Sequence, residues 1–309
     1  MNILLVDLGS NAMRASTYSS TPKGFRKVHD LRFPIRLGDD VFKNGTIGKS
    51  LIEELTQSFK ELFLLCVNNN VPYVMAMATS ALREAKNSQQ IITHIEKITG
   101  IKINLISGIT EAKLVYQSVK KKITTPKNSK NFTLLIDMGG GSCEMVLCNK
   151  EKIFAAQSFA LGTVRLLEQK NLFQMEKIVQ NHKKKMITFL APYLKKDNKI
   201  TMAIGTGGNF RVLRKLRKKI LKKRESAQST KKELEKIYQQ LIQKDYLERI
   251  KDFDLKPDRS DVIVPATYVI KCIMQWFNIN KIMLSDQGLK EGMLESLHQE
   301  LIWIQRRLH

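Results

Sequence analysis

The sequence predicts an α/β protein with two related halves, and three observations support this prediction. Short, branched apolar runs typical of buried strands occur at residues 3–6, 74–77, 103–106, 132–136, 202–204 and 281–285. Stretches with apolar residues at a period near 3.6 lie between them and indicate helices, so strands and helices alternate. The runs at 3–6 and 132–136 both end in an aspartate and a glycine-rich turn, which indicates that one pattern occurs in each half.

The first half is predicted to be a hairpin followed by alternating helices and strands. In order, its elements are a strand at 3–6, a return strand at 13–18, a helix at 49–68, a strand at 74–77, a helix at 88–99, a strand at 103–106 and a helix at 110–119. The return strand is assigned from alternating apolar and polar residues, and the helices from their period. The polar stretch 120–130, which contains Pro126, is the predicted domain boundary.

The second half repeats the hairpin and then becomes strongly basic. In order, its elements are a strand at 132–136, a return strand at 143–147, a strand at 202–204, a basic helix at 211–224, a helix from 230, a helix at 261–277, a strand at 281–285 and a helix at 289–308. Thr230 and Glu233 have the spacing of a capping box. We therefore predict one domain over 1–120 and a second over 131–290, with the C-terminal helix at about 291–309 packed back on the first.

Composition limits the class of protein. With 309 residues, of which 43% are hydrophobic, the chain can bury one or two sizeable cores, which excludes a disordered chain and a small disulfide-stapled fold. The 52 Lys and Arg exceed the 29 Asp and Glu, so the formal charge is +23. This charge favours a polyanionic partner, but it does not choose among nucleic acid, anionic lipid and phosphate chains.

The cysteines and the length of the apolar runs indicate the cellular location of the protein. Cys143 and Cys148 have no second pair and no nearby histidine, which argues against a zinc site, so reduced, buried thiols are expected. The N-terminal apolar run is too short for a signal peptide, and no later stretch approaches the roughly 18 apolar residues of a membrane span. We predict a soluble, cytoplasmic protein without membrane contact.

Three glycine loops follow apolar strands: DLGSN at 7–11, DMGGGS at 137–142 and GTGG at 205–208. Glycines let the backbone approach a ligand and point successive N–H groups into one concavity, which binds phosphate. A single loop of this kind is more often an ordinary turn, but three together favour a phosphate cleft at the strand ends. The predicted phosphate-binding residues are Gly9, Ser10, Asn11, Gly139, Gly140, Gly141, Ser142, Gly207 and Gly208.

Carboxylates beside these loops predict a divalent metal site. Asp7 and Asp137 stand at the two strand ends, and Glu144 follows the second loop. Their oxygens are the ligands that Mg²⁺ prefers, with Mn²⁺ as an alternative. The competing interpretation is that each aspartate only accepts hydrogen bonds within its own turn.

Two further basic features are candidates for anion binding. Residues 78–84 are predicted to form a strand end, a hydroxyl cap and a helix that starts near Arg83, whose guanidinium can hold phosphate oxygens; a surface arginine is the alternative. The helix at 211–224 carries nine Lys or Arg, and it is either a polyanion-binding element or a solvated helix face.

Nine segments together resemble one known family. They are VDLGSNAMR (6–14), RLG (36–38), ATSALREAKN (78–87), ISGITEAKLVY (106–116), IDMGGGSCEMVL (136–147), ALGTVRLLE (160–168), IGTGGNFRVL (204–213), DVIVPATYVI (261–270) and SDQGLKEGML (285–294). In this order and spacing they resemble the exopolyphosphatase / guanosine pentaphosphate phosphohydrolase (Ppx/GppA) family. The resemblance implies a two-lobed actin-like ATPase/sugar kinase fold, built from duplicated ribonuclease H-like domains, with a central cleft.

The resemblance also implies roles for particular residues. It assigns the catalytic glutamate to Glu111, the metal carboxylates to Asp137 and Glu144, and the arginine of the ATSALR segment to Arg83. A carboxylate at a helix start in such a cleft can take the proton of a water that attacks phosphorus. Without the resemblance, Glu111 would be an ordinary residue of a first helical turn.

The implied function is metal-dependent release of terminal orthophosphate from inorganic polyphosphate, from guanosine pentaphosphate or tetraphosphate, or from both kinds of substrate. A homodimer is compatible with the fold, and nucleic acid is a less favoured partner. Two alternatives remain: an actin-like ATPase or sugar kinase, and a non-catalytic regulator that binds an alarmone or polyanion.

The chain departs from the family pattern at three places. Ala12 stands where serine is usual, which removes a hydroxyl from the first loop, and Cys143 stands where threonine is usual. The sequence ends at His309 without the HD pair of longer relatives, so we expect the short, two-domain form.

Overall fold

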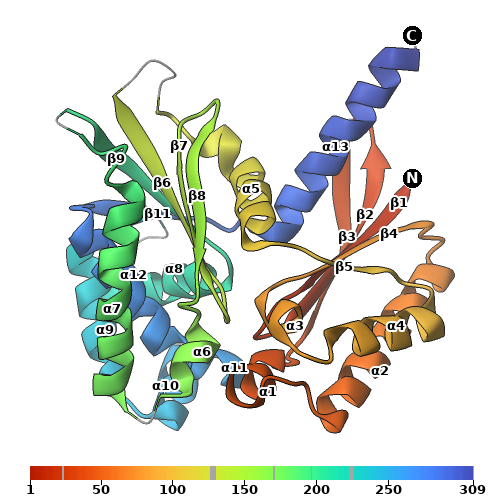
Figure 1. Ribbon diagram of the computed structural model, residues 1–309, viewed down its shortest axis with the longest axis horizontal. Coiled ribbons are helices and arrows are strands. Elements are labelled where there is room, and N and C mark those ends of the chain that lie inside the picture. Colours follow the sequence, from red (N-terminus) through yellow and green to blue (C-terminus); the bar gives the residue numbers. More distant parts are fainter. Residues whose placement is uncertain (23, 126–129, 170, 196, 223–225, 309) are drawn as a thin grey trace.

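Two mixed β-sheets, one in each lobe, form the framework of the computed structural model (Figure 1). The structure describes residues 1–22, 24–125, 130–169, 171–195, 197–222 and 226–308, with side chains up to residue 301. The sheet of the first lobe has the order β3-β2-β1-β4-β5. Its strands are β1 (Asn2–Leu8), β2 (Met13–Thr21), β3 (Gly24–Phe33), β4 (Tyr73–Ala78) and β5 (Ile103–Leu105). Strands β1 to β3 form an antiparallel meander, and β4 and β5 continue from β1 in parallel.

The sheet of the second lobe repeats this order and adds one strand at an edge. Its order is β10-β11-β9-β6-β7-β8. The strands are β6 (Asn131–Met138), β7 (Cys143–Cys148), β8 (Ile153–Phe159), β9 (Lys199–Thr206), β10 (Gln228–Thr230) and β11 (Lys281–Leu284). Again the first three strands are antiparallel neighbours, and β9 and β11 extend the sheet in parallel. The prediction of two related halves is confirmed: the fold is two-lobed and actin-like.

Amphipathic helices cover the first sheet: α1 (Leu37–Asn44), α2 (Lys49–Asn68), α3 (Ser80–Glu84) and α4 (Ser88–Thr99). Helix α5 (Gly108–Val119), which packs on the second sheet, and the short 3₁₀ turn η1 (Lys120–Lys122) follow them along the chain. Helix α2 buries Leu55, Phe59 and Leu62 in the core of this lobe, as its period predicts. Helix α4 ends where Gly100 adopts a left-handed conformation, the usual stop signal of a helix.

The second lobe is richer in helices. They are α6 (Thr163–Leu167), α7 (Leu172–Leu190), α8 (Gly208–Leu221), α9 (Lys231–Ile242), α10 (Tyr246–Phe253), α11 (Pro257–Ser260) and α12 (Ile263–Trp276). The last helix, α13 (Leu289–Leu308), packs back on the first lobe. The predicted capping box is confirmed, because Thr230 and Glu233 exchange both hydrogen bonds. The predicted helix at 211–224 begins earlier and its described part ends at Leu221; residues 223 and 224 lie outside the described residues, as do 126–129 of the predicted boundary.

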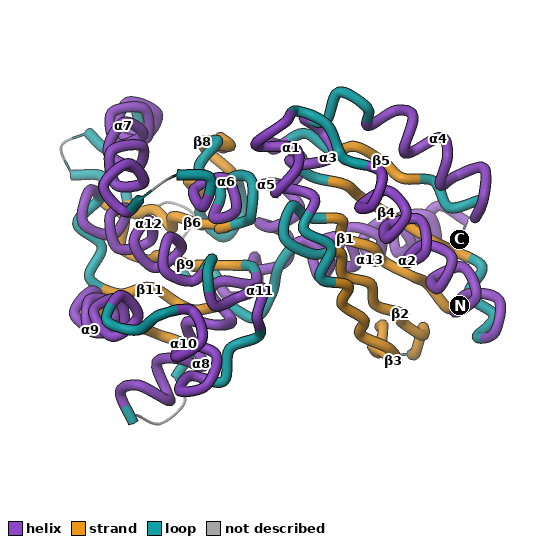
Figure 2. The backbone as a smooth tube through the Cα atoms, turned by 90° about the horizontal axis from the view of Figure 1, so that it is seen from below, coloured by secondary structure: helices purple, strands orange, loops and turns teal. Residues whose placement is uncertain are grey.

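Helices α5 and α13 lie between the two sheets and join the lobes (Figures 1 and 2). One face of α5, with Ala112 and Tyr116, packs on strands β6, β7 and β8 of the second lobe. Helix α13 follows the last strand of the second lobe, yet its Met293 packs with Ile3 and Leu5 of the first. The connections between the lobes therefore include a packed apolar layer as well as chain crossings.

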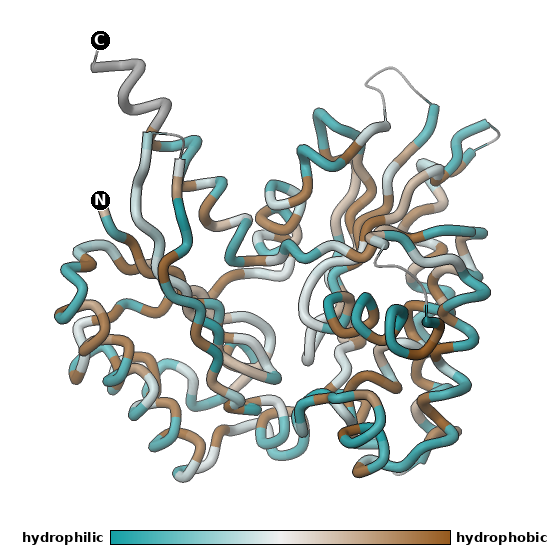
Figure 3. Tube along the Cα trace, turned by 180° about the vertical axis from the view of Figure 1, so that it is seen from behind, coloured by the Kyte–Doolittle hydropathy of each residue, from teal (hydrophilic) through white to brown (hydrophobic). Residues whose placement is uncertain are grey.

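The distribution of hydropathy agrees with this layered arrangement. Hydrophilic and hydrophobic segments alternate along the outer helices, as expected for helices that bury one face (Figure 3). All four cysteines are buried and free, as the sequence predicts. Within the described part of the chain, no helix combines the length and the apolar character needed to cross a membrane.

Candidate active site

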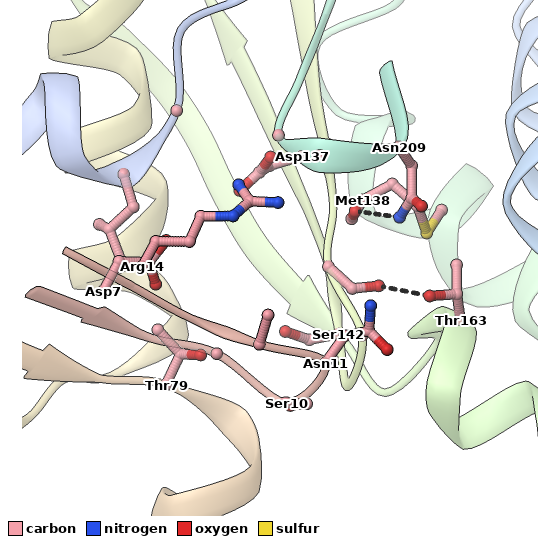
Figure 4. A pocket seen from close by; sticks show the side chains of 18 of the residues that line it. Asp7, Ser10, Asn11, Arg14, Thr79, Asp137, Met138, Ser142, Thr163 and Asn209 are labelled. Atoms are coloured by element: carbon pink, nitrogen blue, oxygen red, sulfur yellow. Dashed lines mark hydrogen bonds between the residues drawn. The ribbon is translucent and has the colours of Figure 1, made fainter. Parts of the chain in front are cut away.

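The three glycine loops meet in one pocket between the lobes, because β1, β6 and β9 all end there (Figure 4). Eight of the nine predicted loop residues line the pocket: Gly9, Ser10, Asn11, Gly139, Gly140, Ser142, Gly207 and Gly208. Gly141 lies directly behind it, where a methyl group would collide with the hydroxyls of Ser10 and Ser80. The structure therefore brings the three loops together, as the sequence predicted.

The first two loops have the same internal hydrogen bond. In the first, the N–H of Gly9 donates to the carbonyl of Ala12 at 3.2 Å; in the second, the N–H of Gly139 donates to that of Ser142 at 3.0 Å. Each bond closes the hairpin turn and leaves the residues between free to face the cleft. The two turns are thus equivalent structures in the two lobes.

The third loop depends on glycine at both of its inner positions. Gly207 has a φ of +89°, and a methyl group there would come within 2.6 Å of Oδ1 of Asp137. A methyl group on Gly208 would collide with the guanidinium groups of Arg14 and Arg259. The glycines therefore make room for charged side chains as well as for a ligand.

Three buried carboxylates meet beside the pocket, and two of them, Glu111 and Asp137, line it. Glu111 comes from the first turn of α5, Asp137 from the end of β6 and Glu144 from the start of β7, and one oxygen of each lies within 4.8 Å of the others. Asp137 and Glu144 are cross-strand partners, an arrangement that is repulsive for two like charges. We call these three residues the acidic trio.

Hydroxyl groups orient two members of the acidic trio. Thr206 donates to Oδ1 of Asp137 at 2.8 Å, and Ser158 donates to Oε1 of Glu144 at 2.7 Å. Oε2 of Glu111 and Oε2 of Glu144 are buried and accept no hydrogen bond from any described atom. Buried carboxylate oxygens this close together fit a divalent cation, which Asp137 and Glu144 would hold beside Glu111.

The pKa values of the acidic trio show the cost of its burial. Burial raises the pKa of Asp137 to about 6, although the hydrogen bond from Thr206 lowers it. Burial and then the charge of Asp137 raise the pKa of Glu144 to about 7. Burial, followed by the charges of Glu144 and Asp137, raises the pKa of Glu111 well above its usual range. A cation among the three would offset this repulsion.

Asp7 lines the same pocket but is not a member of the acidic trio. Asp7 is the cross-strand partner of Arg14, and Figure 4 shows Arg14 reaching past it toward Asp137. Burial raises the pKa of Asp7, while Arg14 lowers it most among the neighbouring charges. Of the three predicted metal carboxylates, the structure brings Asp137 and Glu144 together and adds Glu111; a metal role for Asp7 stays a prediction.

Three arginines that the sequence analysis did not select also line the pocket. Arg14, Arg211 and Arg259 come from β2, α8 and α11. Burial, and then the charges of the other arginines, lowers the pKa of Arg259 well below its usual range. Arg14 lies in a quoted segment and Arg211 begins the basic run, but Arg259 has no local signal. Crowded guanidinium groups favour an anionic ligand.

Arg83 lies behind the acidic trio and is not among the pocket-lining residues. Its Nη1 donates to the carbonyl of Ile106 at 2.6 Å and lies 3.8 Å from Oε2 of Glu111. The predicted hydroxyl cap of this helix is wrong, because Thr79 at the N-cap makes no capping hydrogen bond. Ser80 instead pairs with Ser10 of the first loop at 2.8 Å, which ties the loop to α3.

Fold and site together define a class: an actin-like, two-lobed protein with paired glycine loops and an acidic trio at the cleft. The chain matches the Ppx/GppA phosphatase family over residues 16–301, and it belongs to that family. The family expected from the sequence segments is therefore confirmed.

Several relatives match the chain at low identity over much of its length. The chain is 24% identical over 307 residues to a putative exopolyphosphatase of Haemophilus influenzae; the match covers 96% of this chain and 91% of the relative. It is 23% identical to a guanosine-5'-triphosphate,3'-diphosphate pyrophosphatase of Aliivibrio fischeri, with 96% of this chain but 59% of the relative covered. It spans only 41% of a bifunctional 3-dehydroquinate synthase/phosphatase of Fusobacterium nucleatum.

Solved structures support the fold. An exopolyphosphatase from Cytophaga hutchinsonii superimposes with a TM-score of 0.83 at 22% identity, covering 97% of this chain and 98% of that one. A Ppx/GppA family member from Aquifex aeolicus superimposes with a TM-score of 0.77 at 23% identity and the same coverage.

Proposed function

We propose that this protein is a metal-dependent phosphohydrolase that releases terminal orthophosphate from inorganic polyphosphate, from guanosine pentaphosphate, or from both, with Mg²⁺ or Mn²⁺ as cofactor. Membership of the Ppx/GppA phosphatase family supports the reaction class. The names of the relatives from Haemophilus influenzae and Aliivibrio fischeri support these two substrates.

One observation carries the proposal: the acidic trio, the three arginines and the glycine loops come together at one pocket. Phosphoryl transfer needs a cation and fixed positive charges around the phosphate oxygens, together with a group that activates water. The pocket brings together, within one cleft, carboxylates that could hold a cation, three arginines and a carboxylate that could activate water. An ordinary turn or a structural ion pair would not need them together.

Different residues of the chain would bind the cation and the phosphate groups. Asp137 and Glu144 would hold the cation, which when bound draws charge from the terminal phosphate oxygens. The loop N–H groups would hold further phosphate oxygens, and Arg14, Arg211 and Arg259 would neutralise the charge of the leaving chain. These contacts would fix the terminal phosphorus beside the acidic trio.

Glu111 is the proposed general base. Its Oε2 is buried, accepts no hydrogen bond from the described atoms, and has the Arg83 guanidinium 3.8 Å away. In this proposal Glu111 takes a proton from the water that attacks the terminal phosphorus. Arg83 then serves to hold Glu111 in place and to favour its ionised form.

Phosphate release from polyphosphate, guanosine pentaphosphate and ATP, measured side by side with and without Mg²⁺, tests the proposal. We expect release from one or both of the first two, dependent on the metal and abolished by chelator. Faster turnover of ATP than of either would favour an ATPase or sugar kinase. Tight binding of guanosine pentaphosphate or polyphosphate without any release would favour a regulator.

A further inference from the structure

A cavity of about 320 Å³ lies in the second lobe, where the end of α6 meets the first turns of α7, α10 and α12. Among the described residues none lines both this cavity and the catalytic pocket. We call it the lateral cavity. Its apolar lining consists of Leu166, Leu167, Leu172, Met175, Tyr246, Val264 and Pro265.

Apolar side chains at the lateral cavity are exposed to solvent. Leu172 and Tyr246 line the cavity, and both are exposed. Phe173 and Leu247, which follow them directly in the chain, are the most exposed large apolar side chains in the described part of the protein. Exposed apolar side chains next to a concave apolar surface are typical of a site that binds a partner.

Carboxylates surround the lateral cavity, in contrast to the net charge of +23. Asp261 lines it, Glu168 ends α6, and Asp245 and Glu248 belong to the start of α10. Asp39 of α1 is close to two of them: burial raises the pKa of Asp39, Arg36 lowers it, and the charges of Glu168 and Asp261 raise it further. The rim of the cavity is therefore acidic.

The described cations near this rim already have partners. Arg36 donates to Oδ1 of Asp261 at 3.0 Å, and Lys244 is paired with Asp252 at 2.6 Å. Arg249 lines the cavity, but its guanidinium donates to two backbone carbonyls at 2.9 Å each. The other four carboxylates of the rim form no ion pair with any described residue, so they are available to a cationic partner.

These features select among the possible occupants. The acidic rim repels nucleic acid and phosphate chains, the polyanions that the net charge otherwise favours. A second copy bound across a two-fold axis would place one acidic rim against the other. A small apolar molecule would leave the carboxylates unpaired. A peptide segment that carries Lys or Arg on both sides of a large apolar side chain matches the cavity and the rim together.

We propose that the lateral cavity is a docking site for a short basic segment of another protein. One large apolar side chain of the segment fills the cavity, and its neighbours cover the exposed side chains of Leu172 and Tyr246. The lysines or arginines of the segment lie on the acidic rim. This docking site is independent of the proposed function, because it uses no residue of the acidic trio or of the glycine loops.

Fluorescence anisotropy of labelled peptides with the full chain tests the proposal. The probe is a set of hexapeptides with two lysines on each side of a central pair drawn from Leu, Phe and Trp. One control set has glutamates in place of the lysines, and a second has serines in place of the central pair. We expect the probe to bind, with an affinity that falls as salt is added. Both control sets should bind at least roughly 10-fold more weakly.

A double variant tests the apolar part of the site. Leu172→Ala with Tyr246→Ala should weaken binding of the probe by roughly 10-fold or more, because both side chains would be covered in the complex. The matched control is Leu64→Ala with Tyr73→Ala in the first lobe. Its side chains are 56% and 39% exposed, against 51% and 41% for Leu172 and Tyr246. The control should bind the probe as the wild type does.

A second double variant tests the acidic rim. Asp39→Asn with Glu168→Gln removes two charges and leaves the capping box of α10 intact. We expect a loss of affinity of roughly 2- to 30-fold, from two exposed charge contacts, and a weaker dependence on salt. Glu53→Gln with Glu54→Gln, two exposed residues of α2, is the control and should bind normally.

Four results would overturn the proposal: no binding of the probe set, equal binding of the acidic peptides, unchanged binding by both test variants, or an equal loss in the matched controls. Self-association of the wild type that Leu172→Ala with Tyr246→Ala abolishes would assign the surface to a second copy instead. Because peptide binding and association state are the readouts, none of these results depends on whether the protein releases phosphate.

Discussion

Glu111 occupies the first turn of α5, where an acidic residue is favoured by the helix dipole, and it also belongs to the buried acidic trio. The two environments predict different effects of Glu111→Gln. If the side chain is the base, turnover should fall roughly 10²- to 10⁴-fold while polyphosphate binding stays nearly unchanged. Rate and equilibrium binding are measured on the same sample.

The matched control is Glu53→Gln on α2, whose carboxylate is 67% exposed and far from the loops in the fold. This control should leave both quantities as in the wild type. Near-normal phosphate release by Glu111→Gln would assign the base elsewhere, with Glu144 the next candidate.

Thr206 is fully buried, and its hydroxyl orients Asp137. Thr206→Val keeps the shape of the side chain and removes the hydrogen bond. Loss of such a supporting contact typically weakens metal affinity 10- to 100-fold, which titration of Mg²⁺ or Mn²⁺ into the protein would measure. Thr133→Val is the control, because Thr133 is equally buried but pairs with Thr125. Equal metal affinity in the two variants would contradict the role given to Thr206.

At the scale of elements, Arg165 of α6 connects the second glycine loop to the first lobe. Its Nη2 lies 2.8 Å from both oxygens of Glu84, its Nε donates to the carbonyl of Gly141 at 3.0 Å, and its guanidinium stacks 4.0 Å from the ring centre of Phe42. Lysine preserves the charge but cannot make this planar set of contacts.

We therefore expect Arg165→Lys to lower kcat/KM by up to about 10²-fold, the cost of a small misplacement of a positioning group. Glu84→Gln removes a partly exposed charge and should cost no more than about 5-fold. A double-mutant cycle on kcat/KM measures their coupling. Equal, additive effects of the two substitutions would show that Arg165 does not act through Glu84.

The contact between α13 and α5 depends on Gly292. A methyl group there would collide with the backbone carbonyl of Leu114. Alanine favours a helix over glycine by about 1 kcal/mol, so propensity alone predicts that Gly292→Ala stabilises the protein. We expect the opposite, a loss of about 1–3 kcal/mol in the free energy of unfolding, because the two helices must separate. Urea denaturation of the wild type and the variant measures this difference in the free energy of unfolding.

Ser296→Ala is the control for this substitution. Ser296 is exposed on the same helix, so alanine there should be neutral or slightly stabilising. A Gly292→Ala protein as stable as the Ser296→Ala protein would mean that α13 can shift on α5 without cost.

At the scale of the whole molecule, the acidic trio links metal binding to the stability of the fold. The carboxylates come from α5, β6 and β7, so the site exists only when helix α5 of the interlobe layer is packed on the second sheet. A ligand that binds only the folded state stabilises it by about 2.7 kcal/mol at one hundred times its Kd. We expect Mg²⁺ or Mn²⁺ to raise Tm by several degrees.

Asp137→Asn should reduce this rise in Tm, because it removes one ligand charge, and should raise the metal concentration needed for activity. Calorimetry with metal and with chelator measures the Tm of both proteins, and this readout does not depend on turnover. An identical rise in Tm for wild type and variant would place the cation outside the acidic trio.

The sequence by itself determined much of the local structure. The helices at 49–68, 88–99 and 289–308 have the predicted bounds, and the capping box at Thr230 is formed. These features depend on periodicity, turn glycines and capping side chains, all of which act over a few residues. The edge strand β3 was missed because its charged sequence, GFRKVHDLRF, has weak apolar alternation.

The tertiary structure alone decided which charged groups meet. Glu111 joins Asp137 and Glu144, whereas Asp7 is held beside Arg14, and Arg259 reaches the pocket from a short helix without a sequence signal. Each of these groups is positioned by its own strand or helix, but their separations depend on how two sheets pack around α5 and α13. That packing is set by apolar contacts between residues far apart in the chain, which no local pattern records.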